Sequence, residues 1–92
     1  MKYPKEYLDE IKTRLKVSTV VSRTVNLKKR GKEFVGLSPF KTEKTPSFTV
    51  NDDKEFYHCF ATSEHGNIFD FVMKTQNLKF GESVKFLANL AG

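Results

Sequence analysis

Residues 37–67 constrain the fold of this chain more than any other stretch. They contain two tight turns, which we call the knuckles: residues 38–41 (Ser-Pro-Phe-Lys) form the first and residues 59–62 (Cys-Phe-Ala-Thr) form the second. Two strands, at residues 47–50 and 55–59, are expected between the knuckles, joined by a polar turn. Paired knuckles on a hairpin are typical of a small domain built around a structural metal. The two knuckles here, however, contain a single cysteine, which is the only one in the chain.

Four sequence segments follow one another in a recognisable order. They are Val-Asn-Leu-Lys-Lys-Arg-Gly at 25–31, Glu-Lys-Thr-Pro-Ser-Phe at 43–48, Phe-Tyr-His-Cys-Phe at 56–60 and His-Gly-Asn at 65–67, and a Phe-rich helix follows them. This order resembles the N-terminal zinc-binding domain of bacterial replicative DNA primases of the DnaG type. The resemblance covers nearly the whole chain, and it implies a single zinc-ribbon-like domain over residues 1–92.

The chain departs from that family at the metal ligands. Where the family has Cys-x-x-His and then Cys-x-x-Cys, this chain has Ser38, Lys41, Cys59 and Thr62. Three of the four ligand positions therefore carry other residues, so no zinc or other cofactor is predicted. We hypothesise that Ser38, Lys41 and Thr62 join the knuckles by hydrogen bonds, with Lys41 paired to an acid such as Glu64.

Two other chemical readings of this region are weaker. A rebuilt metal site could use Cys59, His58 and His65, and the same residues could form a thiol with its base. Adjacent residues of a strand point to opposite faces, which separates His58 from Cys59 and argues against both. Asp52 and Asp53 are interpreted as solvated turn residues, so no catalytic residue is predicted.

Composition sets further limits on the chain. At 92 residues it is expected to form one small domain, held by a core rich in its nine Phe and three Tyr. One cysteine excludes an internal disulfide and suits a reducing cytoplasm, the compartment we expect. The sequence has no apolar run of about 18 residues and no leader-like start, so neither a membrane span nor a signal peptide is expected.

Apolar residues at helical spacing predict four short helices. The first two are expected at about residues 4–15 and 18–22, and Ser18 is expected to cap the second. The third begins at Asn67, where Asp70 completes an arrangement like a capping box, and Asn77 is expected to end it. The fourth reaches the end of the chain and carries one apolar stripe: Val84, Leu87, Ala88 and Ala91.

Alternating residues predict the first hairpin. A strand is expected from residue 24, a cationic tip at residues 28–32 with Gly31 at a positive φ angle, and a return strand at residues 34–37. With the central hairpin, these strands predict an α+β fold: a small antiparallel sheet flanked by about four short helices.

The register of the central hairpin is left open by the sequence. A four-residue loop pairs Phe48 with Tyr57, whereas a three-residue loop pairs Phe48 with Phe56. A slip of one residue exchanges the aromatic side chains that face the core.

Charge and aromatic residues together suggest a nucleic-acid surface. Residues 1–30 carry nine Lys or Arg against three acids, whereas residues 31–92 carry seven against eight. Cations that follow phosphates and rings that stack on bases are how small sheets bind single strands. Phe56 and Phe60 are assigned to the core, and a charged turn that protects a sheet edge is the alternative reading of the tip. The candidate nucleic-acid contacts are Lys28, Lys29, Arg30, Lys32, Lys44, Tyr57 and His58.

The resemblance implies a role in recognising the single-stranded DNA template and in steadying the RNA primer. Primer synthesis with magnesium belongs in that family to a separate catalytic domain, and contacts with the replicative helicase belong to other regions, so this chain alone is expected to be inactive. The alternative is a protein-interaction module of the replication machinery that no longer binds nucleic acid.

Overall fold

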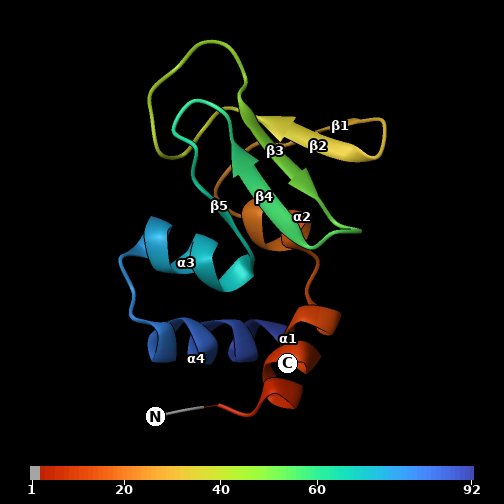
Figure 1. The fold of residues 1–92 in the computed structure, drawn as a ribbon, viewed down its shortest axis with the longest axis vertical. Helices are drawn as coiled ribbons and strands as arrows, with labels where there is room; N and C mark the ends of the chain where they lie inside the picture. The colour runs from red at the N-terminus through yellow and green to blue at the C-terminus, as the bar shows by residue number, and fades with distance from the viewer. Residues whose placement is uncertain (1–2) are drawn as a thin grey trace.

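The computed structural model describes residues 3–92, which form a five-stranded antiparallel sheet and four helices (Figure 1). The strands are neighbours in space in the order of the sequence: β1 (Lys28–Arg30), β2 (Glu33–Gly36), β3 (Phe48–Asn51), β4 (Phe56–Cys59) and β5 (His65–Gly66). The helices are α1 (Lys5–Arg14), α2 (Val17–Val21), α3 (Ile68–Gln76) and α4 (Phe80–Ala91). The predicted α+β class is confirmed, and β5 is a short strand that sequence reasoning missed.

All the helices lie on one side of the sheet. Figure 1 shows the sheet at the top, α2 and α3 beneath it, and α1 and α4 at the bottom. α2 contacts β3 and α3 contacts β5, while α4 packs against both α1 and α3. One sheet face is therefore buried against helices, and we call the other the open face. The buried face contributes four side chains to the core: Phe48, Val50, Tyr57 and Cys59.

Helix α3 begins and ends where the sequence predicts. The side chain of Asn67 accepts hydrogen bonds from the backbone N–H groups of Phe69 (2.9 Å) and Asp70 (3.1 Å). The Asp70 carboxylate in turn accepts from the Asn67 N–H at 2.9 Å, which completes the capping box. At the other end Asn77 adopts the left-handed conformation with φ of 54°. Both predicted ends of the helix are confirmed.

The first hairpin is shifted from its predicted position. The backbone N–H groups of Thr24 and Val25 still bond to the Val21 carbonyl, so helical turns continue past α2 and the chain extends only afterwards. Strand β1 consequently starts at Lys28 rather than at residue 24. Three of the cations assigned to the tip thus lie in a strand, and the tip itself contains Gly31, which has the predicted positive φ of 63°.

Both registers considered for the central hairpin are wrong. Phe48 pairs with Cys59, and Tyr57 pairs with Val50. The reason lies in the turn, where Glu55 takes a left-handed conformation with φ of 58° and so leaves the strand. Asn51 meanwhile belongs to β3, and its side chain accepts a hydrogen bond from the Lys54 N–H at 2.9 Å.

Among residues 3–92, none of the helices has both the length and the apolar character needed to cross a membrane.

Candidate nucleic-acid interface and the two knuckles

Glu43 organises the first knuckle. Its carboxylate accepts hydrogen bonds from the backbone N–H groups of Ser38 (2.9 Å) and Ser47 (3.1 Å), and from the Ser47 hydroxyl at 2.8 Å. These donors, led by the Ser38 N–H, hold the pKa of Glu43 below its ordinary value. One carboxylate thereby ties the start of the 37–47 loop to its end.

Cys59 links the second knuckle to the first. Its side chain is fully buried, and the thiol donates to the Ser38 hydroxyl oxygen at 3.2 Å, with the Ser47 hydroxyl at 3.9 Å. Burial alone raises the pKa of the Cys59 thiol. Hydrogen bonds that Ser38, Thr62 and the Ala61 N–H donate to the ionised thiolate outweigh this effect, so the net pKa is lowered. The Cys59 side chain therefore joins the two knuckles through Ser38.

Two details of the hypothesised knuckle network are wrong. Lys41 is exposed, and Glu64 forms its ion pair with Lys74 instead, at 3.6 Å. The Thr62 hydroxyl donates to Glu64 at 3.4 Å, which joins residues of the same turn rather than the two knuckles. Only Ser38 makes the predicted link. Sequence reasoning missed Glu43, although its place four residues before Ser47 was a signal that could have found it.

The donor set at the four former ligand positions does not suit zinc. It consists of one thiol, two hydroxyls and an exposed ammonium, whereas structural zinc sites use four sulfur or imidazole ligands. Within the described residues, no group of three or more His, Cys, Asp or Glu side chains is placed to hold a metal ion. His58 and His65 do approach each other, with ring centres 6.0 Å apart, but Cys59 lies on the buried face and His58 does not.

One row of side chains crosses the open face of the sheet. The register aligns Lys28 with Val35, Val35 with Thr49, Thr49 with His58, and His58 with His65. The row begins with a cation on β1 and ends with two imidazole rings on β4 and β5. Such a row offers charge at one edge of the sheet and flat rings at the other.

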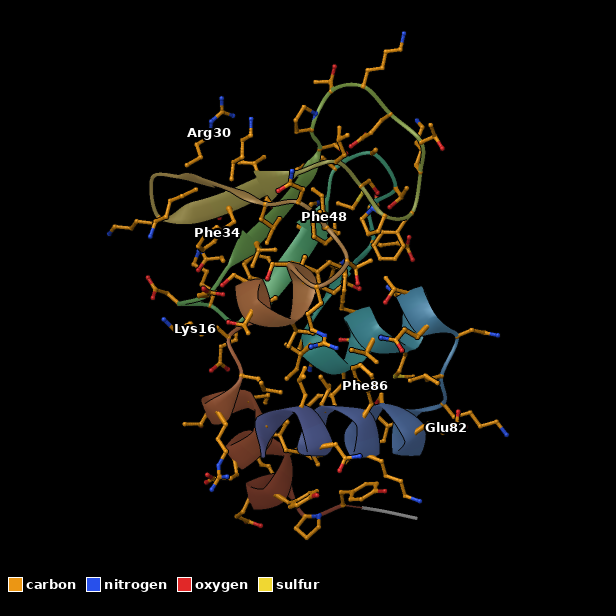
Figure 2. All side chains as sticks on the ribbon, turned by 180° about the vertical axis from the view of Figure 1, so that it is seen from behind. Lys16, Arg30, Phe34, Phe48, Glu82 and Phe86 are labelled. Atoms are coloured by element: carbon orange, nitrogen blue, oxygen red, sulfur yellow. The ribbon has the colours of Figure 1, made fainter. Side chains whose placement is uncertain are left out.

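The predicted cations divide between the two faces. Lys28 and Arg30 share the open face, and Figure 2 shows Arg30 pointing away from the helices. Lys29 belongs to the other face, where its ammonium lies 5.4 Å from the ring centre of Phe34. Lys32 is exposed in the turn and Lys44 in the 37–47 loop, so the five cations do not form one cluster.

The aromatic side chains are distributed differently from expectation. Tyr57 is fully buried within stacking distance of Phe48, with ring centres 5.4 Å apart, so this arrangement does not present it to a base. Burial raises the pKa of Tyr57, as do the nearby charges of Asp70 and Glu64. Phe60, assigned to the core, is instead 69% exposed, and its ring centre lies 4.4 Å from that of His58.

Comparison with known proteins identifies the family. A family model described as CHC2 zinc finger matches residues 3–92. The chain belongs to the CHC2 zinc finger family. It is 47% identical over 89 residues to a DNA primase of Pseudomonas putida and 45% identical over 85 residues to one of Escherichia coli K12, covering 97% and 92% of this chain.

This CHC2 zinc finger chain spans 14% of the first relative's length and 15% of the second's. Its fold also matches a crystal structure of the Aquifex aeolicus primase that contains the zinc-binding and RNA polymerase domains. The TM-score is 0.87 at 29% sequence identity, over 94% of this chain and 21% of that one. The knuckles of this member thus keep the family's fold with a different donor set.

Proposed function

We propose that this CHC2 zinc finger domain recognises the single-stranded DNA template of a DNA primase. The observation that carries the proposal is the open face, where Lys28 and Arg30 lie at one edge and His58 and Phe60 at the other. Cations follow a phosphate backbone, and exposed rings stack on bases at about 1–3 kcal/mol per base. Phe60 replaces Tyr57 as the proposed stacking ring because only Phe60 is exposed.

The sequence relatives support the proposal that this domain acts as part of a DNA primase. They are DNA primases, and this chain corresponds to a small part of their length. In the proposed assignment, residues 1–92 form one domain that holds template and nascent primer. Another domain joins ribonucleotides with magnesium, and other regions contact the replicative helicase. A cytoplasmic location is part of the same proposal.

A salt titration with charge reversals tests the DNA proposal. The double variant Lys28→Glu/Arg30→Glu is expected to lose most affinity for a short fluorescent oligodeoxynucleotide. The slope of log affinity against log salt should fall by roughly 0.7 for each lost phosphate contact. The control is Lys5→Glu/Lys85→Glu, which makes the same charge change at exposed helical positions of the lower layer.

The outcomes of that titration separate the two candidate functions. Equal losses in both double variants would show that net charge, not the open face, drives binding. No affinity for DNA in the unchanged chain, together with a salt-insensitive affinity for another replication protein, would favour the protein-interaction module.

We also infer that the knuckles of this domain are held without zinc. The Glu43 carboxylate with Ser38 and Ser47, and the Cys59–Ser38 hydrogen bond, connect the same segments that a metal would connect. Elemental analysis of protein purified without added metal is the direct test. A stoichiometric zinc content, or unfolding by a chelator, would overturn the inference.

A further inference from the structure

A groove of about 530 Å³ lies between the first hairpin and the 37–47 loop. Apolar side chains line much of it, including those of Val35, Leu37 and Pro46. Polar residues on either side, among them Asn26 and Ser38, offer hydrogen-bond partners. This size and this mixture of linings are typical of sites for small ligands, which occupy about 300–1,000 Å³.

A second hollow of about 390 Å³ continues the groove toward the hairpin tip. The two share Lys28, Val35 and Pro46, so they adjoin, and we call them together the depression. The side chains of Lys28 and Val35 belong to the open face. Lys28, Lys29 and Arg30 line the second hollow, and Lys28 and Lys44 line the first. The lining residues, all within the described part of the chain, include no Asp or Glu. The depression therefore suits an anionic ligand with an apolar part.

Gly36 shapes one wall of the groove. A Cβ atom at this position would lie 2.8 Å from the Asn26 carbonyl oxygen and 3.0 Å from a methyl group of Val25. Only glycine thus lets β2 lie directly against the segment that leads into β1. This close approach, between residues ten positions apart, fixes the wall from which the groove extends.

Building on the proposed function, we propose that the groove receives one unstacked base of single-stranded DNA and that the second hollow receives its phosphate. A base has apolar faces and a polar edge, which match Leu37 and Pro46 on one hand and Asn26 and Ser38 on the other. Lys28 stands where the two hollows meet, the position at which base and phosphate join through the sugar. The groove would then select a nucleotide, while Phe60 and His58 stack bases without selecting them.

The test pairs a groove variant with a strand that lacks bases. Leu37→Gln changes an apolar groove side chain without changing charge, and Leu37 is 47% exposed, so little core packing is lost. Tyr7→Gln is the matched control, because Tyr7 is 43% exposed and lies on α1, outside the groove. Affinity is measured for a short oligothymidylate and for an abasic strand of equal length at one salt concentration.

The expected result is a coupling between Leu37 and the bases. Leu37→Gln should weaken binding of the oligothymidylate roughly tenfold and leave binding of the abasic strand unchanged. Tyr7→Gln should leave the binding of both strands unchanged. In the unchanged protein, the amide NMR signals of Asn26, Val35 and Leu37 should shift with the oligothymidylate and less with the abasic strand.

Three results would overturn the groove assignment. Equal weakening of both strands by Leu37→Gln would show that the groove does not hold a base, as would no weakening of either strand. If either of these two results is found and Lys28→Glu/Arg30→Glu nevertheless loses DNA binding, the groove assignment fails while the proposed template-binding face stands. If neither strand binds the unchanged protein, both proposals fail together.

Discussion

Asp52 caps helix α2 although it lies 34 residues after Ser18, the helix residue that it contacts. Its carboxylate, in the turn between β3 and β4, accepts hydrogen bonds from the N–H of Ser18 at 2.8 Å and from the Ser18 hydroxyl at 2.6 Å. Helix α2 has only five residues, and its N-cap residue Lys16 makes no side-chain cap. The predicted cap at Ser18 is therefore wrong, because Ser18 lies inside the helix. A helix this short is unstable alone, so the turn helps to hold α2 under the sheet.

We expect Asp52→Ala to lower the free energy of unfolding by about 1 kcal/mol, the usual cost of losing a helix cap. The matched control is Asp53→Ala, because Asp53 is the exposed neighbour in the same turn; its effect should stay within roughly 0.5 kcal/mol. Urea unfolding of both variants measures the difference. Equal effects would mean that the hydrogen bonds to Ser18 contribute nothing.

Gly66→Ala is expected to destabilise the domain by about 1–3 kcal/mol, because Gly66 has φ of 155° and an added Cβ would overlap the Asp70 carboxylate. That carboxylate completes the capping box of α3. Gly81→Ala should act in the opposite direction, by about 0.5–1 kcal/mol, since Gly81 lies in α4 with the nearest atom 3.8 Å from its added Cβ. Thermal unfolding distinguishes the two signs.

Glu43 should make stability depend on pH in the acid range. Its pKa in the folded chain lies below the ordinary value of 4.5, because the N–H of Ser38 and the Ser47 groups bond to the ionised form. The stabilisation is therefore complete above pH 4.5 and is lost as pH falls through the lower folded-state pKa.

Unfolding midpoints of Glu43→Gln and of the unchanged chain should accordingly differ most near neutral pH and converge in acid. Glu55→Gln, which removes an exposed carboxylate in the β3–β4 turn, serves as the control and should not reproduce this convergence. A gap between Glu43→Gln and the unchanged chain that stays constant with pH would argue against the assigned role of the carboxylate.

Restoring the ligand types at the knuckles should create a zinc site. The triple variant Ser38→Cys/Lys41→His/Thr62→Cys supplies four ligands in two pairs together with Cys59, the arrangement that structural zinc requires. We expect it to bind one zinc per chain and to unfold at a lower temperature after chelation, whereas the unchanged chain should be indifferent to the chelator. Absence of zinc binding in the triple variant would show that the knuckles have lost the geometry as well as the ligands.

The sequence by itself determined the features that depend on near neighbours. The capping box of Asn67 and Asp70, the left-handed Asn77 and the positive φ of Gly31 were all predicted and found. Each rests on contacts or backbone preferences within a few residues, which local residue types specify. The same holds for the replacement of three of the four zinc ligands by other residues, which can be read directly from the sequence.

Tertiary structure decided the features that depend on distant partners. Asp52 looked solvated until the fold brought it to Ser18, 34 residues away, and the left-handed Glu55 set a register that the loop length did not reveal. That register buried Tyr57, while Phe60, just beyond the strand, is exposed, so the stacking ring could not be named from the sequence. A one-residue change of register reverses which side chains face the helices, and only packing against those helices selects between the two.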